Sequence, residues 1–523
     1  MRSVRAFAAA GATLVVTATA AGASPTWQAA VRLSPSDRAL SPELALNAAG
    51  AAAVVWDHEQ GADCPTQPAS LSCIHIVEAA THPAGRGGWQ PPIEVARPGI
   101  GALPRAAIDP AGDIAIVWVH DIGEDRVLQA TIRPAGAPTW PNANDLSGSP
   151  LQIKNHEVAL DAQGNATAVW AQRDTTTFYV VGDLRPAAEG VWRAPVALSS
   201  FSADATSGPV LASVPSGDVL VAWIDSGAMR VAHGNASTGT WDVALTPAGG
   251  GVGTDTDVDV ALNAAGDAVA AWSWRRAAAG ANIVQAAFRP AGGNWGAVTD
   301  LGVSGPGRSH VQAAINDAGS VAAVWLDRTS LRAAGRSRST GAWSAPATVA
   351  TNVAPAGARL AMNPAGNAVV VWPNGTTGAV RAALRPTGGA WQPPVRIGGP
   401  SSSEPRVALD GASRAVAVWN RTSSQVVFTE SAELAPTGPV LASVQVPANA
   451  RVGNPKTFSV SPRPWAAPLA GSPLWRFGDG KSASGTHVTH TYRSAGTFTV
   501  TVAQTDASGN RSTATRKASV TLH

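Results

Sequence analysis

One twelve-residue pattern recurs along this chain, and no other feature constrains its fold as strongly. Residues 159–170 read ALDAQGNATAVW, and closely similar stretches end at Trp118, Trp272 and Trp372. Each copy is a short apolar segment, a turn of the form Asp/Asn-x-x-Gly-Asp/Asn, and a second apolar segment that ends in Trp. A period of about fifty residues indicates a repeat architecture, in which each unit packs against its neighbours.

Each repeat contains four strand-sized segments. The Asp or Asn of the turn can accept a backbone N–H, and the Gly adopts the positive φ that a tight hairpin requires. A third segment, such as NIVQAAFRP at residues 282–290, leads through Ala-Gly-Gly to a fourth that begins with Trp, such as WGAVTDLG at residues 295–302. Four short strands per repeat are typical of a β-propeller blade, so the sequence predicts an all-β fold.

The tryptophans give the number of blades. Eight of them close the second segment of a repeat: Trp56, Trp118, Trp170, Trp223, Trp272, Trp325, Trp372 and Trp419. Eight others open the fourth segment: Trp27, Trp89, Trp140, Trp192, Trp241, Trp295, Trp343 and Trp391. We therefore predict an eight-bladed β-propeller over residues 24–433, in which these tryptophans pack between neighbouring sheets. An aromatic ligand-binding box is the alternative role for them.

The two tryptophan sets are out of phase, which predicts how the ring closes. Trp27 precedes every first segment, and no fourth segment follows Trp419. The segment at residues 27–33 should therefore pair beside residues 426–431 as the outer strand of the last blade. This closure would remove an open sheet edge and tie both ends of the array together. Val214 and Ser413 depart from the turn pattern, and we expect the neighbouring blades to tolerate them.

The N-terminus has the features of a secretory signal peptide. Residues 1–23 carry two arginines, then an apolar stretch, then Ala21-Gly22-Ala23 as a small-residue cleavage site. A membrane anchor is the alternative, but the apolar stretch is short and rich in Ala, Gly and Thr. We expect a mature chain without a membrane span that is secreted or associated with the cell surface.

After Glu433 the repeat phase is lost, and we interpret residues 434–523 as a linker and a second domain. Alternating segments such as TFTVTV at residues 497–502 predict a β-sandwich. The same region contains the stretch WRFGDG at residues 475–480, followed by His490 and Tyr492.

These motifs resemble the PKD (polycystic kidney disease) domain family. The resemblance covers Trp475, Phe477, Gly478, Asp479, Gly480, His490 and Tyr492. It implies an immunoglobulin-like β-sandwich that serves as a spacer or interaction module of extracellular proteins. One aspartate makes a poor cation site, so we interpret the Gly-Asp-Gly stretch as a turn and expect no metal.

No catalytic constellation stands out in the propeller segment. There is no Gly-x-Ser-x-Gly after a predicted strand, no His-Glu-x-x-His and no phosphate-binding loop. A sialidase-like glycosidase would need a Tyr nucleophile, but Tyr179 lies in a predicted strand and Tyr492 belongs to the PKD-like motif. The formal net charge of +3 lacks the large positive excess that is typical of nucleic-acid-binding proteins. We expect neither a cofactor nor a nucleic-acid partner.

Loop variation points to one face of the ring. The connections after the second-segment tryptophans differ from blade to blade, whereas the other turns are short and uniform. Two residues past these tryptophans stand His58, His120, Gln172, Asp225, Trp274, Asp327, Asn374 and Arg421. They are either solvated loop residues or a rim that binds a polar ligand such as a glycan or a peptide.

These observations favour a secreted, non-enzymatic binding protein, monomeric, with an extracellular glycan or protein ligand at its variable face. One alternative is a secreted carbohydrate-active hydrolase or lyase that uses residues such as His58, His120, Asp225 and Asp327. Another is a structural protein of the cell envelope.

We predict that Cys64 and Cys73 form a disulfide in the secreted protein. They are the only cysteines, they lie close together, and no further metal-ligand pair stands nearby. Closing so short a loop should stabilise the fold by roughly 2–3 kcal/mol, with a local effect. Mass spectrometry of non-reduced peptides tests this pairing, and two free thiols would contradict it.

Overall fold

Strands and turns make up the described part of the chain. The computed structural model describes residues 27–34, 38–60, 74–84, 88–99, 102–121, 126–148, 152–173, 177–199, 205–225, 228–245, 257–275, 282–305, 309–355, 357–424, 426–434, 438–447, 449–465, 468–507 and 509–522. The predicted signal peptide, Cys64 and Cys73 lie outside these ranges. Within them, no helix has the length and apolarity to cross a membrane.

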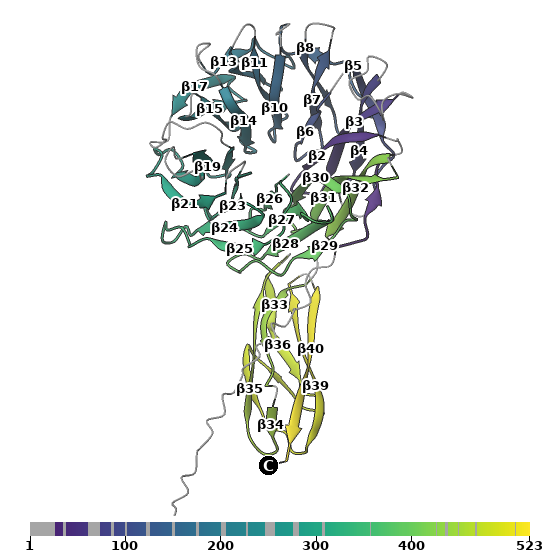
Figure 1. The fold of residues 1–523 in the computed structure, drawn as a ribbon, viewed down its shortest axis with the longest axis vertical. Coiled ribbons are helices and arrows are strands. Elements are labelled where there is room, and N and C mark those ends of the chain that lie inside the picture. Colours follow the sequence, from purple (N-terminus) through teal and green to yellow (C-terminus); the bar gives the residue numbers. More distant parts are fainter. Residues whose placement is uncertain are drawn as a thin grey trace, which may run out of the picture. The chain divides into compact units, whose positions relative to one another are not determined.

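Eight antiparallel sheets of four strands each form a closed ring (Figure 1). The first strands of successive sheets contact one another all the way round, and the first strand of the eighth sheet contacts that of the first. The all-β, eight-bladed propeller predicted from the sequence is therefore confirmed.

In each blade the strands follow one another outward from the ring's axis. The first strands are β2 (Ala39–Leu46), β6 (Arg105–Ile108), β10 (Gln152–Leu160), β14 (Ala205–Ser213), β18 (Val258–Leu262), β22 (Gln312–Ile315), β26 (Arg359–Met362) and β30 (Ser402–Leu409). The second strands are β3 (Ala52–Gln60), β7 (Ile114–Asp121), β11 (Ala166–Arg173), β15 (Asp218–Asp225), β19 (Ala268–Arg275), β23 (Val321–Asp327), β27 (Ala368–Pro373) and β31 (Ala415–Ser423). The third strands are β4 (Ile74–His82), β8 (Arg126–Arg133), β12 (Tyr179–Arg185), β16 (Ala228–Asn235), β20 (Asn282–Arg289), β24 (Ser330–Arg336), β28 (Val380–Arg385) and β32 (Val426–Leu434). The outer strands are β5 (Ile93–Gly99), β9 (Asn144–Asp145), β13 (Val196–Ala197), β17 (Thr240–Leu245), β21 (Thr299–Ser304), β25 (Ala347–Ala350), β29 (Val395–Arg396) and, for the eighth blade, β1 (Val31–Arg32).

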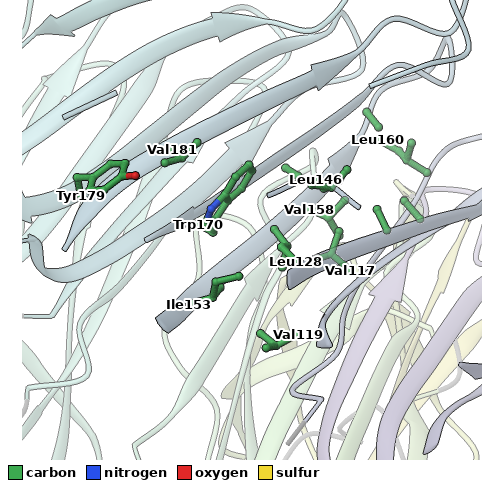
Figure 2. Close-up of a cluster of buried hydrophobic side chains, with 14 residues drawn as sticks. Val117, Val119, Leu128, Leu146, Ile153, Val158, Leu160, Trp170, Tyr179 and Val181 are labelled. Carbon is green, nitrogen blue, oxygen red and sulfur yellow. The ribbon is translucent and has the colours of Figure 1, made fainter. Parts of the chain in front are cut away.

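The hydrophobic core lies between the blades. All eight second-strand tryptophans are at most 2% exposed. Between the second and third blades, Trp170 packs with Val117, Leu128 and Val181 (Figure 2). The partly buried Trp192 packs against the same cluster. The tryptophans therefore fill the space between sheets, as the repeat predicts, and each blade buries its faces only against its neighbours.

The predicted Asp/Asn turns form between the first and second strands. The Oδ1 atom of Asp161 accepts hydrogen bonds from the N–H groups of Gln163 at 2.8 Å and Asn165 at 2.9 Å. Gly164 between them has a φ of 77°, which an L side chain rarely adopts. The local sequence alone therefore accounts for this hairpin.

The eighth blade keeps this geometry without the glycine. Ser413 has a φ of 65°, and its Oγ accepts hydrogen bonds from the Nδ2 atoms of Asn363 at 3.0 Å and Asn367 at 2.8 Å in the seventh blade. The neighbouring blade therefore holds a residue in a backbone region that normally favours glycine.

The same turns link neighbouring blades. The Nδ2 atom of a turn asparagine donates to the backbone carbonyl of the next turn in three places: Asn47 to Asp109 (2.8 Å), Asn263 to Asn316 (3.0 Å) and Asn363 to Asp410 (3.2 Å). The N–H of Gly411 donates to the carbonyl of Ala48 at 3.1 Å, which joins the eighth blade to the first.

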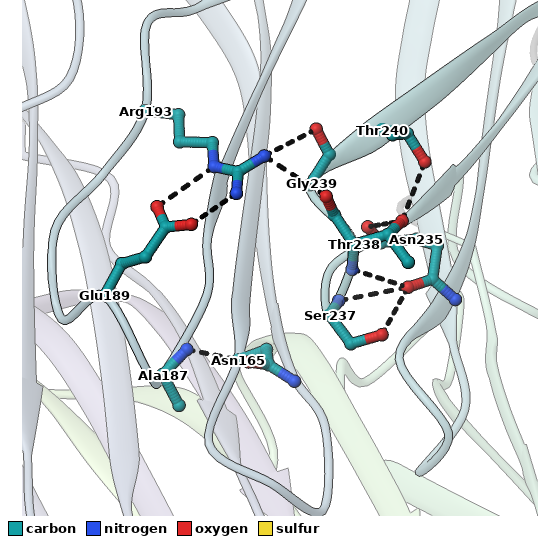
Figure 3. Close-up of polar contacts among 9 residues, drawn as sticks. All are labelled: Asn165, Ala187, Glu189, Arg193, Asn235, Ser237, Thr238, Gly239 and Thr240. Carbon is teal, nitrogen blue, oxygen red and sulfur yellow. Dashed lines mark hydrogen bonds and ion pairs between the residues drawn. The ribbon is translucent and has the colours of Figure 1, made fainter.

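The connections between third and fourth strands add further links between blades. In the third blade, Arg193 pairs with Glu189, and its Nη1 atom also donates to the carbonyls of Thr238 at 3.2 Å and Gly239 at 3.1 Å in the fourth blade (Figure 3). Gly239 has a φ of 67°, which favours glycine, and a Cβ there would displace the Arg193 guanidinium group.

The N-terminal strand lies where the tryptophan phase places it. In β1, Val31 pairs with Ser431 and Arg32 with Glu430 of β32, and an isolated bridge joins Trp27 to Leu434. The backbone N–H of Leu33 donates to the carbonyl of Thr429 at 2.8 Å. The eighth blade therefore combines the two ends of the repeat array.

Contacts divide the described residues into the propeller, Pro25–Pro436, and a second unit that begins at Thr437. The second unit is a sandwich of two sheets. One sheet consists of β33 (Val440–Gln445), β35 (Lys456–Arg463) and β38 (His487–His490). The other consists of β34 (Asn449–Arg451), β40 (Arg511–Thr521), β39 (Gly496–Asp506), β36 (Leu469–Arg476) and β37 (Ser482–Ser484).

The PKD-like motif residues lie in and around the core of this sandwich. Trp475, Phe477 and Tyr492 are buried together, and the Tyr492 hydroxyl donates to the carbonyl of Phe477 at 3.0 Å. The His490 ring stacks on Phe477, and its Nε2 lies 2.8 Å from Asp479 Oδ2. Asp479 Oδ1 also accepts the N–H of Lys481 at 3.1 Å, which fits the predicted turn.

Removing β1 should destabilise the propeller. A chain that starts at residue 34 would expose the edge of β32 and lose several backbone hydrogen bonds, each worth about 1 kcal/mol. We expect its thermal midpoint to fall by at least about 5 °C. Differential scanning calorimetry tests this against a control chain that starts at residue 27 and keeps the strand. Equal midpoints would show that closure does not depend on β1.

Candidate functional site

The rim residues predicted from the sequence lie at the ends of the second strands, where several bond within their own blade. The Nδ1 atom of His58 lies 3.2 Å from Glu78 Oε1, and the other carboxylate oxygen of Glu78 accepts the indole N–H of Trp56 at 2.8 Å. In the eighth blade Arg421 and Trp419 bind Glu430 in the same way, at 3.0 and 2.9 Å. These carboxylates orient the tryptophans between the blades.

The other rim residues also lie at the ends of their second strands, where they are at least partly buried or bonded within their own blade. Asp225 is buried, with its carboxylate 4.0 Å from the guanidinium of Arg230, and Asn374 accepts the N–H of Thr377 at 3.1 Å. Gln172 donates to the Tyr179 hydroxyl at 2.6 Å. His120, Trp274 and Asp327 are partly buried at the ends of their strands. The eight side chains thus stay on eight separate blades, and ligand binding by them stays a prediction.

A polar cavity of about 520 Å³ lies elsewhere, between the eight first strands. Its lining comes from all eight first strands and from residues just before some of them, such as Asp257 and His310. Because strand direction alternates within a blade, each first strand begins at the face that carries the variable second-to-third-strand loops. The cavity therefore belongs to the variable face. None of the eight rim residues lines it.

One register position supplies most of the charge in this cavity. The residue four places before the turn Asp or Asn, or its equivalent, lines the cavity in every blade: Glu43, Arg105, Glu157, Val210, Asp259, Gln312, Arg359 and Arg406. We call these eight residues the axial ring. All of them are partly buried. The ring thus holds three carboxylates and three guanidinium groups around one axis.

Half of the axial ring is a continuous chain of ion pairs. Arg406 of the eighth blade donates through Nε to Glu43 of the first blade at 2.9 Å. Arg105 of the second blade lies between two carboxylates, with 3.6 Å from Nη1 to Glu43 and 3.7 Å from Nε to Glu157 of the third blade. Four neighbouring blades are therefore joined by alternating charges.

Two members of the other half, Asp259 and Gln312, bond to the backbone of the next blade. Asp259 accepts the N–H of Ala313 at 2.8 Å, and Gln312 accepts the N–H of Leu360 at 2.7 Å. Arg359 donates through Nη1 to the carbonyl of Ala358 at 3.2 Å. Within the described residues, no carboxylate lies within 4 Å of the Arg359 guanidinium.

The pKa values of the axial ring reflect both burial and the neighbouring charges. Burial acts against the charge of Glu43, but Arg406 and Arg105 hold the pKa of Glu43 below its usual value. Burial raises the pKa of Asp259 to about 7, because two backbone N–H groups and Arg359 compensate only in part. Burial and the nearby charge of Arg406 lower the pKa of Arg359 to about 10.

The opposite end of the axis is apolar. A second cavity of about 340 Å³ is lined by the C-terminal halves of β14, β18, β22, β26 and β30. Two places before the turn, every blade has alanine: Ala45, Ala107, Ala159, Ala212, Ala261, Ala314, Ala361 and Ala408. The polar groups of the axis therefore gather at the end that belongs to the variable face.

The sequence contained a signal for the axial ring. The segments ELALN, EVALD, DVALN and RVALD, which begin at residues 43, 157, 259 and 406, each open with a charge four places before the turn. Charged residues at one fixed position of an otherwise apolar inner strand indicate a common polar environment. The eight blades bring these separate positions together.

The raised pKa of Asp259 predicts a pH-dependent stability. The folded state keeps a proton that the unfolded chain releases above its usual pKa near 4, so this group destabilises the fold increasingly as pH rises from about 4 to 7. Asp259→Asn removes that effect. One pKa unit is about 1.4 kcal/mol and water in the cavity reduces the shift, so the variant should gain roughly 1–3 kcal/mol relative to the wild type across this range.

Urea unfolding followed by tryptophan fluorescence between pH 4 and 8 measures this gain. Asp317→Asn, at an exposed turn, is the control for losing one negative charge. If the difference between Asp259→Asn and wild type stays constant with pH, burial does not govern this carboxyl group.

Comparison with known proteins supports the C-terminal assignment. Residues 437–522 match the PKD domain family, and no curated protein matches the chain. An ulvan lyase, a polysaccharide lyase, is 11% identical with a TM-score of 0.44, covering 76% of this chain and 95% of its own. A fungal alcohol oxidase in complex with copper is 12% identical with a TM-score of 0.42, covering 96% and 100%.

A third solved structure, the α-L-arabinanase of Penicillium chrysogenum, is 13% identical with a TM-score of 0.34, covering 61% of this chain and 100% of its own. Similarity at this level carries no argument about activity. The chain combines an eight-bladed β-propeller with a PKD domain at residues 437–522.

Proposed function

We propose that this protein is a secreted, non-enzymatic binding protein whose ligand site is the polar cavity inside the axial ring. The observation that carries the proposal is the convergence of charged side chains from six blades on one cavity at the variable face. Its volume of about 520 Å³ falls within the range of small-ligand sites. The predicted signal peptide and the PKD domain, a module of extracellular proteins, support an extracellular role.

The cavity is a better ligand site than the rim for a physical reason. Rim residues such as His58, Gln172 and Arg421 use their polar atoms within their own blades. A ligand there would have to displace bonds that orient the buried tryptophans. The axial ring instead presents partly buried charges to a cavity of about 520 Å³.

The PKD domain acts in this proposal as a spacer or a second contact surface. The protein works as a monomer, because pairing β1 with β32 completes the ring. Several outer strands are also very short: β1, β9, β13 and β29 have two residues each. Short edges offer little template for pairing with another chain.

A carbohydrate-active hydrolase or lyase is the second candidate, and one observation favours it. A carboxyl group whose pKa is raised to about 7, as burial does for Asp259, can donate a proton at neutral pH. Burial also raises the pKa of Glu157 in the same cavity, although Arg105 opposes it. Two such carboxyl groups in one cavity are the minimum that acid–base chemistry on a glycoside requires.

A matched pair of variants separates these functions. The purified chain is probed on glycan and peptide arrays and assayed with chromogenic glycosides and uronate polymers. Asp259→Ala alters the cavity, and Asp327→Ala removes the same group from the rim. We expect saturable binding without turnover, weakened at least tenfold by Asp259→Ala and unchanged by Asp327→Ala.

Each other result selects another function. Turnover that Asp259→Asn abolishes would establish the enzyme. Binding that only Asp327→Ala weakens would place the site on the rim. A chain that is silent in every assay would leave a structural role in the cell envelope.

A further inference from the structure

The axial ring is not electrically uniform. From the eighth to the third blade its charges neutralise one another through the pairs Arg406–Glu43, Glu43–Arg105 and Arg105–Glu157. The fourth blade contributes Val210, which interrupts the chain of charges. What the ring offers a ligand therefore depends on the remaining three blades and on the atoms of Arg406 that Glu43 does not use.

On this side of the ring, the side-chain groups that are left for a ligand are hydrogen-bond donors. The guanidinium of Arg359 has one hydrogen bond, to the carbonyl of Ala358, and no carboxylate within 4 Å in the described part of the chain. Arg406, next in the ring, uses Nε for Glu43 and Nη1 for the carbonyl of Pro405 at 3.3 Å. No hydrogen bond involves the Nη2 atom of either arginine within the described residues.

The amide of Gln312 is oriented to donate in the same place. Its Oε1 must be the atom that accepts the N–H of Leu360 at 2.7 Å, because a backbone N–H cannot bond to an amide nitrogen. The Nε2 group is then left as a donor. Gln312 and Arg359 occupy neighbouring positions of the axial ring, so their donors come from adjacent blades.

Carboxylates do not offset these donors. Glu43 and Glu157 are paired with arginines, and Asp259 already accepts the N–H of Ala313. Asp257, which also lines the cavity, accepts the N–H of His310 at 2.6 Å. Burial raises the pKa of Asp259 to about 7, so at mildly acidic pH this group is neutral and can itself donate. The side of the cavity formed by the sixth to eighth blades is therefore rich in donors and has no carboxylate among its described lining residues.

Aromatic stacking is not available to a ligand in this cavity. Its described lining contains the imidazole of His310 but no Trp, Tyr or Phe side chain. A neutral sugar would therefore lack the flat apolar surface on which rings pack. Charge and hydrogen bonding must supply most of the affinity.

We infer that the ligand of the polar cavity is an acidic saccharide, whose carboxylate or sulfate oxygens bind Arg359 and the adjoining donors of Gln312 and Arg406. This inference rests on the proposed function and deepens it. A planar guanidinium matches both oxyanions with paired hydrogen bonds. The remaining polar groups of the axial ring suit the hydroxyls of the same molecule.

Isothermal titration calorimetry with the full chain tests the inference. The probes are an oligogalacturonate, a sulfated chondroitin oligosaccharide, a neutral malto-oligosaccharide of equal length and a short polyglutamate peptide. The first two separate carboxylate from sulfate as the bound group. We expect at least one acidic saccharide to bind and the neutral one to bind at least tenfold more weakly.

Arg359→Gln should weaken acidic-saccharide binding at least tenfold. Arg359→Lys keeps the positive charge but not the planar guanidinium that makes paired hydrogen bonds, so it should weaken binding less. Arg381→Gln makes the same charge change at an exposed position of the same blade and should bind as the wild type does. Circular dichroism and thermal midpoints show whether each variant is folded. If Arg359→Gln does not fold, Arg359→Lys and the comparison of probes carry the test.

These measurements distinguish a failure of the acidic-saccharide inference from a failure of the proposed binding function. Neutral and acidic saccharides that bind equally, without an effect of Arg359→Gln, would overturn the acidic class and leave the binding function standing. Binding of polyglutamate alone would overturn the saccharide. A chain that binds none of the probes and nothing on the arrays would overturn both the inference and the proposed function.

Discussion

Packing between blades is the interaction on which the whole propeller depends. A four-stranded sheet with two apolar faces cannot be stable alone, and each face here is covered only by the next blade. The second-strand tryptophans fill most of that space, as Trp170 does against Val117 and Leu128. Such packing has no natural end except a closed ring, which is why the N-terminal strand completes the eighth blade.

The first strand of each blade carries three separate requirements within five residues. The turn Asp or Asn fixes the hairpin and, in several blades, bonds to the next turn. Two places earlier, alanine allows eight strands to approach one axis. Four places earlier, charged side chains line the polar cavity. They need partners there because they are partly buried. The ion pairs of the axial ring follow from that need.

Sequence reasoning reached the architecture because local chemistry determines it. The Asp161 turn depends on a few neighbouring residues, and the tryptophan count and the position of residues 27–33 follow from repeating the same local pattern along the chain. The axial ring was missed because its members differ in chemistry from blade to blade, from Glu43 to Val210, and so do not look like a motif. Their convergence depends on closing the ring, which no single repeat reveals.

The rim hypothesis assumed that a polar residue near a loop faces solvent. Strand periodicity argues otherwise, since the residue two places after a tryptophan lies on the same sheet face as that tryptophan. His58 and Arg421 accordingly bind the carboxylates that hold Trp56 and Trp419. For these two residues the sequence pattern thus reflects packing around the tryptophans, and ligand binding by the rim residues stays a prediction.

A ring of similar repeats becomes a binding site only where the repeats differ. If every blade carried the same charge at the axial position, repulsion between partly buried groups would destabilise the ring, and strict alternation would leave no charge for a ligand. This chain does neither. Alternation holds from Arg406 to Glu157 and Val210 interrupts it. Among the described residues, no carboxylate then lies within 4 Å of the Arg359 guanidinium. The broken alternation keeps the ring stable and leaves one cation for a ligand.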